Sequence, residues 1–323
     1  MRRRPVARSG VRLFLFLLAA MGVPSLAARP VLAQAAWIAP KGEASFSLGY
    51  GNAFMKKHYF GSVETDIGHS RSNSLLFGLE YSITDRLAAD VGLGYGYNKY
   101  YGNSPHAGSE LDNGAYHGSF ADYAINIRYQ VLKEPFVLTP FVGAIIPSHD
   151  YVFRAHSAVG KDLHEYPVGF HLARRLDPLL PDAFVHASYS YSFVERVLGI
   201  FHDKSTVNLD LGYFVSSSLG VRVAGTYGQS HGGLNIPDDL TTPELRQHHD
   251  QLSKDSFVNV GLGLTLALTG AVDVYGGYSR TVWGRNGHKV EPALSFGFAW
   301  NFSPQQLVRR TFVGKPRRGR EVQ

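Results

Sequence analysis

The sequence predicts an all-β fold, a transmembrane antiparallel β-barrel of about twelve strands, and three observations support this prediction. Apolar residues alternate with polar residues or glycine over most of the chain after residue 43, which is the period of a β-strand. The connections between these stretches are short and long in turn, as in barrels with short periplasmic turns and longer extracellular loops. Aromatic residues gather near the ends of the stretches, as at the two interfaces of a membrane.

The composition of the first 33 residues predicts a secretory signal peptide. An arginine-rich start precedes an apolar run at residues 11–23, and small residues precede Gln34. The run is short for a transmembrane helix, although an uncleaved anchor remains the alternative. Cleavage after Ala33 or Ala35 removes six arginines and no acid, which takes the formal net charge from +6 to about zero. The basic charge is therefore no evidence for nucleic-acid binding.

The barrel is expected over residues 34–304. Its first six stretches cover residues 43–51, 74–83, 86–98, 119–131, 136–146 and 164–176. In the second stretch, Leu75, Phe77 and Leu79 share one face, and polar or small residues occupy the other. The fifth and sixth stretches alternate less cleanly. Six further stretches cover residues 183–193, 207–215, 219–226, 258–268, 272–282 and 294–302.

The last stretch, LSFGFAWNF, alternates almost without error. It resembles the aromatic-terminated closing strand that the barrel assembly machinery recognises, so this machinery and outer-membrane lipids are the expected partners. Pro304 follows and cannot continue strand pairing. We expect residues 305–323, which are rich in arginine and lysine, to form a disordered periplasmic tail.

The connections predict which end of the barrel carries the loops. Short turns are expected near residues 84–85, 133–134, 177–182, 216–218 and 269–270, and longer loops at 52–71, 101–117, 148–161 and 231–253. Two other loop-side connections, near 199–204 and 285–287, are brief. In the 231–253 loop, Thr242 followed by Pro243 predicts the start of a short helix. This loop is expected to narrow the outer mouth.

The face opposite the apolar residues is rich in charge, glycine, serine and asparagine. This composition suits a polar lumen better than the packed core of a soluble sandwich or lipocalin-like barrel. The candidate lumen-lining residues are Glu80, Asp90, Arg128, Asp210 and Arg222, and the same face carries Glu43, Arg86, Asp122, His186, Asp273 and Glu291. Such a lining could select a permeant. Alternatively, these residues could form a charge network in which arginines and carboxylates only pair with one another and select no permeant.

Histidines concentrate in the predicted outer loops, where they could serve as metal ligands or as part of a catalytic motif. His248, His249 and Asp250 with His231 could bind a metal, but their spacing supports no metal site, and solvated loop histidines are the expectation. GHSRSN, residues 68–73, loosely resembles the H-x-S-N-G motif of twelve-stranded outer-membrane phospholipases. The serines of this stretch do not match the serine position of the motif, and the glycine that ends the motif is missing. The sequence thus predicts no catalytic residue, metal or cofactor.

Residues 118–151 resemble a family of bacterial outer-membrane proteins assigned to the MetA pathway of phenol degradation. The resemblance rests on Asp122, on Arg128-Tyr129, on residues 136–140 after a tight turn, and on residues 147–151. TDRLAADVGLGYGY and the closing strand fit the same layout. The resemblance implies passage of a small aromatic or hydrophobic solute across the outer membrane. The hydrocarbon channels are less similar, because no plug domain fits before Glu43.

The expected function is therefore a porin-like channel or transporter in the outer membrane of a Gram-negative bacterium. It would conduct a small solute passively, and no enzyme activity or nucleic-acid partner is expected. A non-conducting structural or surface-binding barrel is the alternative, and an outer-membrane lipid hydrolase is a third reading.

Overall fold

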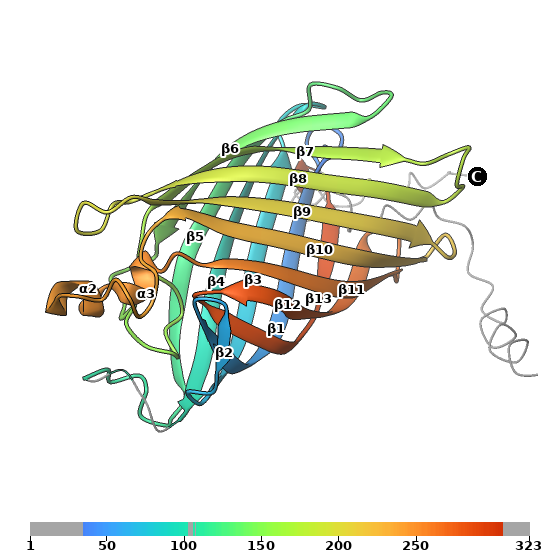
Figure 1. Ribbon diagram of the computed structural model, residues 1–323. Helices are drawn as coiled ribbons and strands as arrows, with labels where there is room; N and C mark the ends of the chain where they lie inside the picture. The colour runs from blue at the N-terminus through green and yellow to red at the C-terminus, as the bar shows by residue number, and fades with distance from the viewer. Residues whose placement is uncertain (1–34, 103–105, 107, 306–323) are drawn as a thin grey trace, which may run out of the picture.

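The computed structural model describes residues 35–102, 106 and 108–305 (Figure 1). The predicted signal peptide and nearly all of the predicted basic tail lie outside the described residues. Among the described residues, no helix is long and apolar enough to cross a membrane.

The described chain forms one antiparallel sheet of thirteen strands. Apart from the short β2, which pairs only with β1, each strand lies beside the strand that follows it in the sequence. β1 pairs with β13 from Ala44↔Phe302 to His58↔His288, and this pairing closes the sheet into a barrel. Closure leaves no sheet edge with unpaired backbone groups, which a strand in lipid could not tolerate. The elements are β1 Ala44–Phe60, β2 Val63–Thr65, β3 His69–Ser82, β4 Leu87–Tyr101, β5 His117–Tyr129, β6 Val137–Pro147, β7 Glu165–Arg175, β8 Ala183–Val194, β9 His202–Phe214, β10 Leu219–Gly232, α2 Pro243–Gln247, α3 His249–Leu252, β11 Ser256–Ala267, β12 Val272–Arg285 and β13 His288–Phe302.

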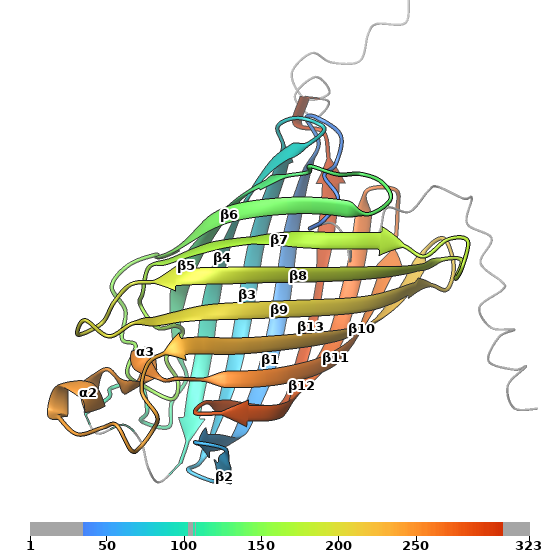
Figure 2. The ribbon, with the colours of Figure 1, turned by 45° about the horizontal axis from the view of Figure 1, so that its top comes forward.

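The predicted architecture is confirmed. β2 has three residues and pairs only with the end of β1, so the other twelve strands make the barrel wall. All twelve predicted stretches lie on separate strands of this wall. The short connections meet at one end, here called the turn end. The longer ones meet with α2 and α3 at the other, here called the loop end (Figures 1 and 2).

Several strands are longer at the loop end than predicted. β1 continues to Phe60 and β3 begins at His69, so the predicted loop over residues 52–71 is mostly strand. The alternation fades in this region because backbone pairing continues beyond the apolar part of the wall. β1 even carries two register irregularities against β13, between Ala53 and Lys57. The strands therefore extend past the apolar zone, and we call this extension, which includes β1 from Asn52 to Phe60, the polar collar.

The outer face of the barrel is an apolar belt. Leu211, Leu262 and Phe296 are 53%, 61% and 60% exposed, and similar side chains occupy the outward positions of neighbouring strands. This much exposed aliphatic surface is unfavourable in water and is the outward face expected in lipid. The predicted aromatic ends are confirmed for Tyr97 and Trp300, which are exposed.

Tyr100 is a correction to the predicted aromatic strand ends: the sequence clusters it with Tyr95, Tyr97 and Tyr101 at one end of a stretch, but it is buried. It is 2% exposed, and its hydroxyl donates to the backbone carbonyl of Ile67 at 2.5 Å. Its neighbour Tyr101 faces outward, because successive residues of a strand point to opposite faces. Arg86 is a second correction, since it lies exposed in the β3–β4 turn and not in the lumen.

Candidate functional site

Two ion-pair clusters lie inside the barrel, on opposite sections of its wall. In the first, Arg128 of β5 reaches Glu80 of β3 at 2.7 Å and Asp90 of β4 at 2.9 Å. Asn126 adds a hydrogen bond of 2.8 Å to Asp90. These residues meet because Glu80 pairs in register with Asp90, and Asp90 with Asn126, across the three strands. The Arg128 side chain is only 5% exposed, so its charge depends on these partners.

The second cluster joins three further strands. Asp210 of β9 lies 3.2 Å from Nδ1 of His186 on β8 and 3.3 Å from Nη1 of Arg222 on β10. The structure thus brings the five predicted lumen residues together in two groups, one on β3–β5 and one on β8–β10.

Residues that sequence reasoning passed over connect the two groups. Phe141 pairs in register with Arg128, and its ring stacks on His171 with centroids 4.9 Å apart. His171 stacks in turn on His186 at 5.5 Å. The inward side chains from β3 to β10 therefore form one continuous row, here called the charged belt: Glu80, Asp90, Arg128, Phe141, His171, His186, Asp210 and Arg222. His171 lies in a stretch that alternates poorly, which hid its inward position.

The charged belt borders open space. A cavity of about 640 Å³ is lined by belt residues together with Ser45, Ser47, Tyr275 and Ala299. A second, smaller cavity nearer the loop end is also lined by Arg222. A third cavity is lined by Ser279 and Ser295, which line the second cavity as well. Nδ1 of His171, Nε2 of His186 and Nε of Arg222 are buried and have no hydrogen-bond partner among the described residues. The hydrogen-bonding capacity of these three atoms is therefore not used within the described residues.

The segment before β1 enters the lumen from the turn end. Ala36 is fully buried against Val137 and Ala173. Its carbonyl accepts hydrogen bonds from Gln130 at 3.2 Å and Thr139 at 2.5 Å. The carbonyl of Ala35 accepts from Arg128 at 2.8 Å. Residues 35–41 thus form a short internal plug, which the sequence did not predict.

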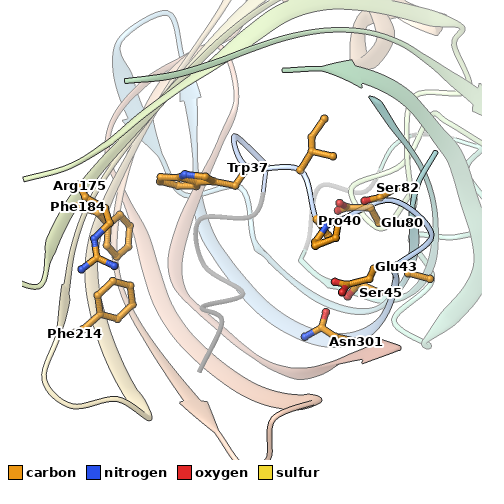
Figure 3. A pocket seen from close by; sticks show the side chains of 13 residues that line it. Trp37, Pro40, Glu43, Ser45, Glu80, Ser82, Arg175, Phe184, Phe214 and Asn301 are labelled. Atoms are coloured by element: carbon orange, nitrogen blue, oxygen red, sulfur yellow. The ribbon is translucent and has the colours of Figure 1, made fainter. Parts of the chain in front are cut away.

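Trp37 of this segment lies inside the lumen at the turn end, between two groups of wall residues. Figure 3 shows its ring between Arg175, Phe184 and Phe214 on one side and Glu43, Glu80 and Asn301 on the other. These residues line a cavity of about 320 Å³ that shares Glu80 and Ser45 with the larger one. The cavity combines aromatic rings with both signs of charge.

The GHSRSN residues are not arranged for nucleophilic catalysis. Ser70 donates to the backbone carbonyl of His156 at 3.2 Å, and Ser72 donates to the Asn98 side chain at 2.8 Å. The ring of His69 stacks on Tyr101 instead. A serine nucleophile needs a base beside its hydroxyl, and this stretch provides no such pair within the described residues.

Five histidines and two aspartates converge at the loop end, and we call them the histidine cluster: His58, His106, His156, His249, His288, Asp112 and Asp250. They come from the end of β1, the start of β13 and three different loops. His231, which the sequence offers as a further metal-binding candidate beside His248, His249 and Asp250, lies outside this cluster, with its Nε2 2.6 Å from Ser205 Oγ. Within the cluster, burial and the charges of His106 and His288 lower the pKa of His156 to about 4. His156 is therefore neutral.

Comparisons with known proteins agree with the fold. No protein-family model and no curated protein sequence matches the chain. Its structure is similar to an outer-membrane channel from Pseudomonas putida F1, with a TM-score of 0.65, 13% identity and coverage of 85% of this chain and 99% of that one. The toluene transporter TodX of P. putida gives a TM-score of 0.44 at 10% identity, covering 82% and 91% of the two chains. The NanC porin gives 0.47 at 10% identity, covering 79% and 98%. The first of these similarities supports the closed barrel.

Proposed function

We propose that the protein is an outer-membrane channel that conducts a small solute passively through the barrel. The observation that carries this proposal is the polar lumen: a charged belt borders a row of cavities inside a wall whose outer face is apolar. A barrel filled only for stability would gain more from packed apolar side chains than from buried charges. Charged and hydrogen-bonding groups facing open space are instead what pore linings use to select permeants.

We place the turn end in the periplasm and the loop end outside the cell, because transmembrane barrels carry short turns and long loops in this orientation. Export would follow removal of the signal peptide at residues 1–33. Outer-membrane lipids and the barrel assembly machinery are the partners in this proposal.

The solute is proposed to be a small compound with an aromatic or hydrophobic body. Two observations support this class. Residues 118–151 resemble the phenol-degradation family, and the turn-end cavity sets Trp37, Phe184 and Phe214 beside charged groups. Pockets for small molecules typically combine apolar walls with a few polar groups that fix orientation.

Uptake into proteoliposomes tests this function. Liposomes that contain the purified full-length protein should swell in isosmotic phenylalanine, a small aromatic solute without net charge, and remain unchanged in raffinose, a much larger solute. Swelling no faster than protein-free liposomes in both solutes would contradict the proposal.

A non-conducting barrel is the second candidate, and the internal plug is the observation that favours it. Residues 35–41 are held by Arg128, Gln130 and Thr139, so they could close the lumen permanently. If a Trp37→Ala variant is as impermeable as the parent protein, this second function is supported.

A further inference from the structure

We propose that His106, His249 and Asp250 form a binding site for one divalent transition-metal ion, of the chemical class of Zn²⁺, at the loop end of the barrel. This inference is independent of conduction, since it concerns only the loops above the lumen.

The donor atoms already have the spacing of metal ligands. Nε2 of His106 lies 3.1 Å from Nε2 of His249 and 3.3 Å from Oδ2 of Asp250. Nε2 of His249 lies 3.2 Å from Oδ1 of Asp250. Ligands bound tetrahedrally to zinc at about 2.0–2.1 Å are separated by about 3.3 Å. Three donors therefore surround a point that suits such an ion.

The hydrogen bonds on the far sides of both rings fix which nitrogen faces that point. Nδ1 of His249 lies 2.7 Å from the backbone carbonyl of Arg246, which can only accept. Nδ1 of His106 lies 3.0 Å from the carboxylate of Asp112. Each neutral ring thus carries its proton on Nδ1 and presents the lone pair of Nε2 to the other. A carbonyl or carboxylate behind the ring is the arrangement that orients metal-bound histidines in proteins.

Asp112 is itself held firmly as a carboxylate. It accepts hydrogen bonds from the backbone of His156 at 3.0 Å and from the backbone and hydroxyl of Ser157 at 3.1 and 2.9 Å. The position of His106 is therefore fixed through Asp112 by a second loop.

Two facing lone pairs beside a carboxylate need a positive charge between them. Oδ2 of Asp250 is buried and has no hydrogen-bond partner among the described residues, so its approach to His106 is a charge contact. A divalent cation would satisfy all three donors at once.

The donor set also indicates the class of ion. Imidazole nitrogens with one carboxylate suit Zn²⁺, Cu²⁺, Ni²⁺ and Co²⁺, whereas Ca²⁺ and Mg²⁺ prefer sets made of oxygen. An ion here would tie the loop after β4 to the loop that contains α3.

Zinc binding to the purified full-length protein tests the proposal. The protein should carry no polyhistidine tag and should be stripped with a chelator before Zn²⁺ is titrated by calorimetry. We expect one site in the parent protein. His106→Gln and His249→Gln each remove a ligand and should lower the affinity for Zn²⁺ at least about tenfold. Asp112→Asn alters the hydrogen bond that orients His106 and should lower this affinity by about 10–100-fold. The control His231→Gln replaces a loop-end histidine outside the cluster and should bind as the parent does.

Each variant is first checked for the heat-modifiable gel mobility of a folded barrel, so that loss of folding is not mistaken for loss of the site. Co²⁺ in place of Zn²⁺ should give the visible absorption of a tetrahedral nitrogen–oxygen site, and this absorption should vanish in His249→Gln. No zinc binding by the parent protein would overturn the proposal. Unchanged binding in His106→Gln and His249→Gln with loss in His58→Gln would also overturn it.

Discussion

At the scale of single residues, Arg128 links the lumen to the segment that enters it. Its guanidinium contacts Glu80, Asp90 and the carbonyl of Ala35, and all three contacts are shorter than 3 Å. A buried cation between two carboxylates is costly to remove, because both carboxylates then remain in the lumen without their partner. Arg222 has the same side chain but is 33% exposed and contacts Asp210 at 3.3 Å. The two arginines therefore form a matched pair for mutation.

Arg128→Met should lower the free energy of unfolding by about 3 kcal/mol. Arg222→Met should lower it by less than about 1 kcal/mol, because its ion pair is partly solvated. Urea unfolding in lipid vesicles, followed by tryptophan fluorescence, measures both values. Equal losses for the two variants would show that Arg128 does not have the supporting role described here.

Glycine is required at one close approach of the wall. A Cβ added to Gly169 would lie 2.1 Å from the backbone carbonyl of Tyr189, whereas one added to Gly92 would meet nothing closer than 3.4 Å. Gly169→Ala should therefore destabilise the barrel by about 1–3 kcal/mol, and Gly92→Ala should be nearly neutral. The same unfolding measurement checks this pair, and a neutral Gly169→Ala would contradict the packing of β7 against β8.

At the scale of elements, alternation predicted the strands well where they cross the apolar zone. Leu75, Phe77 and Leu79 on one face of β3 already indicate an outward face toward lipid and an inward polar face. The same rule placed Glu80, Asp90, Arg128, Asp210 and Arg222 inside, since inward positions follow directly from parity. Alternation could not predict the collar of β1 from Asn52 to Phe60, because strand pairing there is not accompanied by an apolar face.

Other features depend on long-range contacts that no local pattern encodes. The internal plug is too short to be recognised as an element, and it is held by Gln130 and Thr139 from distant strands. The histidine cluster comes from five segments, so no spacing within any one segment reveals it. The available signals were the concentration of histidines in the predicted outer loops and the adjacent pair His249 and Asp250.

The plug makes a prediction about conductance. Trp37→Ala should increase the single-channel conductance, because the indole ring stands between the two walls of the turn-end cavity (Figure 3). Phe120→Ala removes an aromatic ring that is 47% exposed on the barrel wall, and it should leave the conductance unchanged. Planar-bilayer recordings compare the two variants. No change in Trp37→Ala would mean that residues 35–41 do not limit the pore.

At the scale of the whole molecule, the barrel divides into three zones along its axis. The turn end holds the internal plug, the middle carries the charged belt within the apolar wall, and the loop end gathers the histidine cluster above the collar. Closure by β1 and β13 allows every polar backbone group in the middle zone to pair, so the lumen can remain polar without weakening the wall. The central claim is that solute passes through this middle zone.

The belt's charge predicts the ion preference of that pathway. Two arginines face three carboxylates, Glu80, Asp90 and Asp210, so with neutral histidines the belt carries a net charge of −1. The open barrel should therefore favour cations weakly, and Asp210→Asn should reduce this preference. The reversal potential across a salt gradient measures it, and a preference for anions in the parent protein would contradict the account.

Single-channel recording of the purified full-length protein in a planar bilayer tests the central claim most directly. We expect discrete current steps of uniform size, which appear only after the protein is added and which grow in Trp37→Ala. A bilayer that stays electrically silent, with protein that still shows the gel mobility of a folded barrel, would contradict conduction through the charged belt.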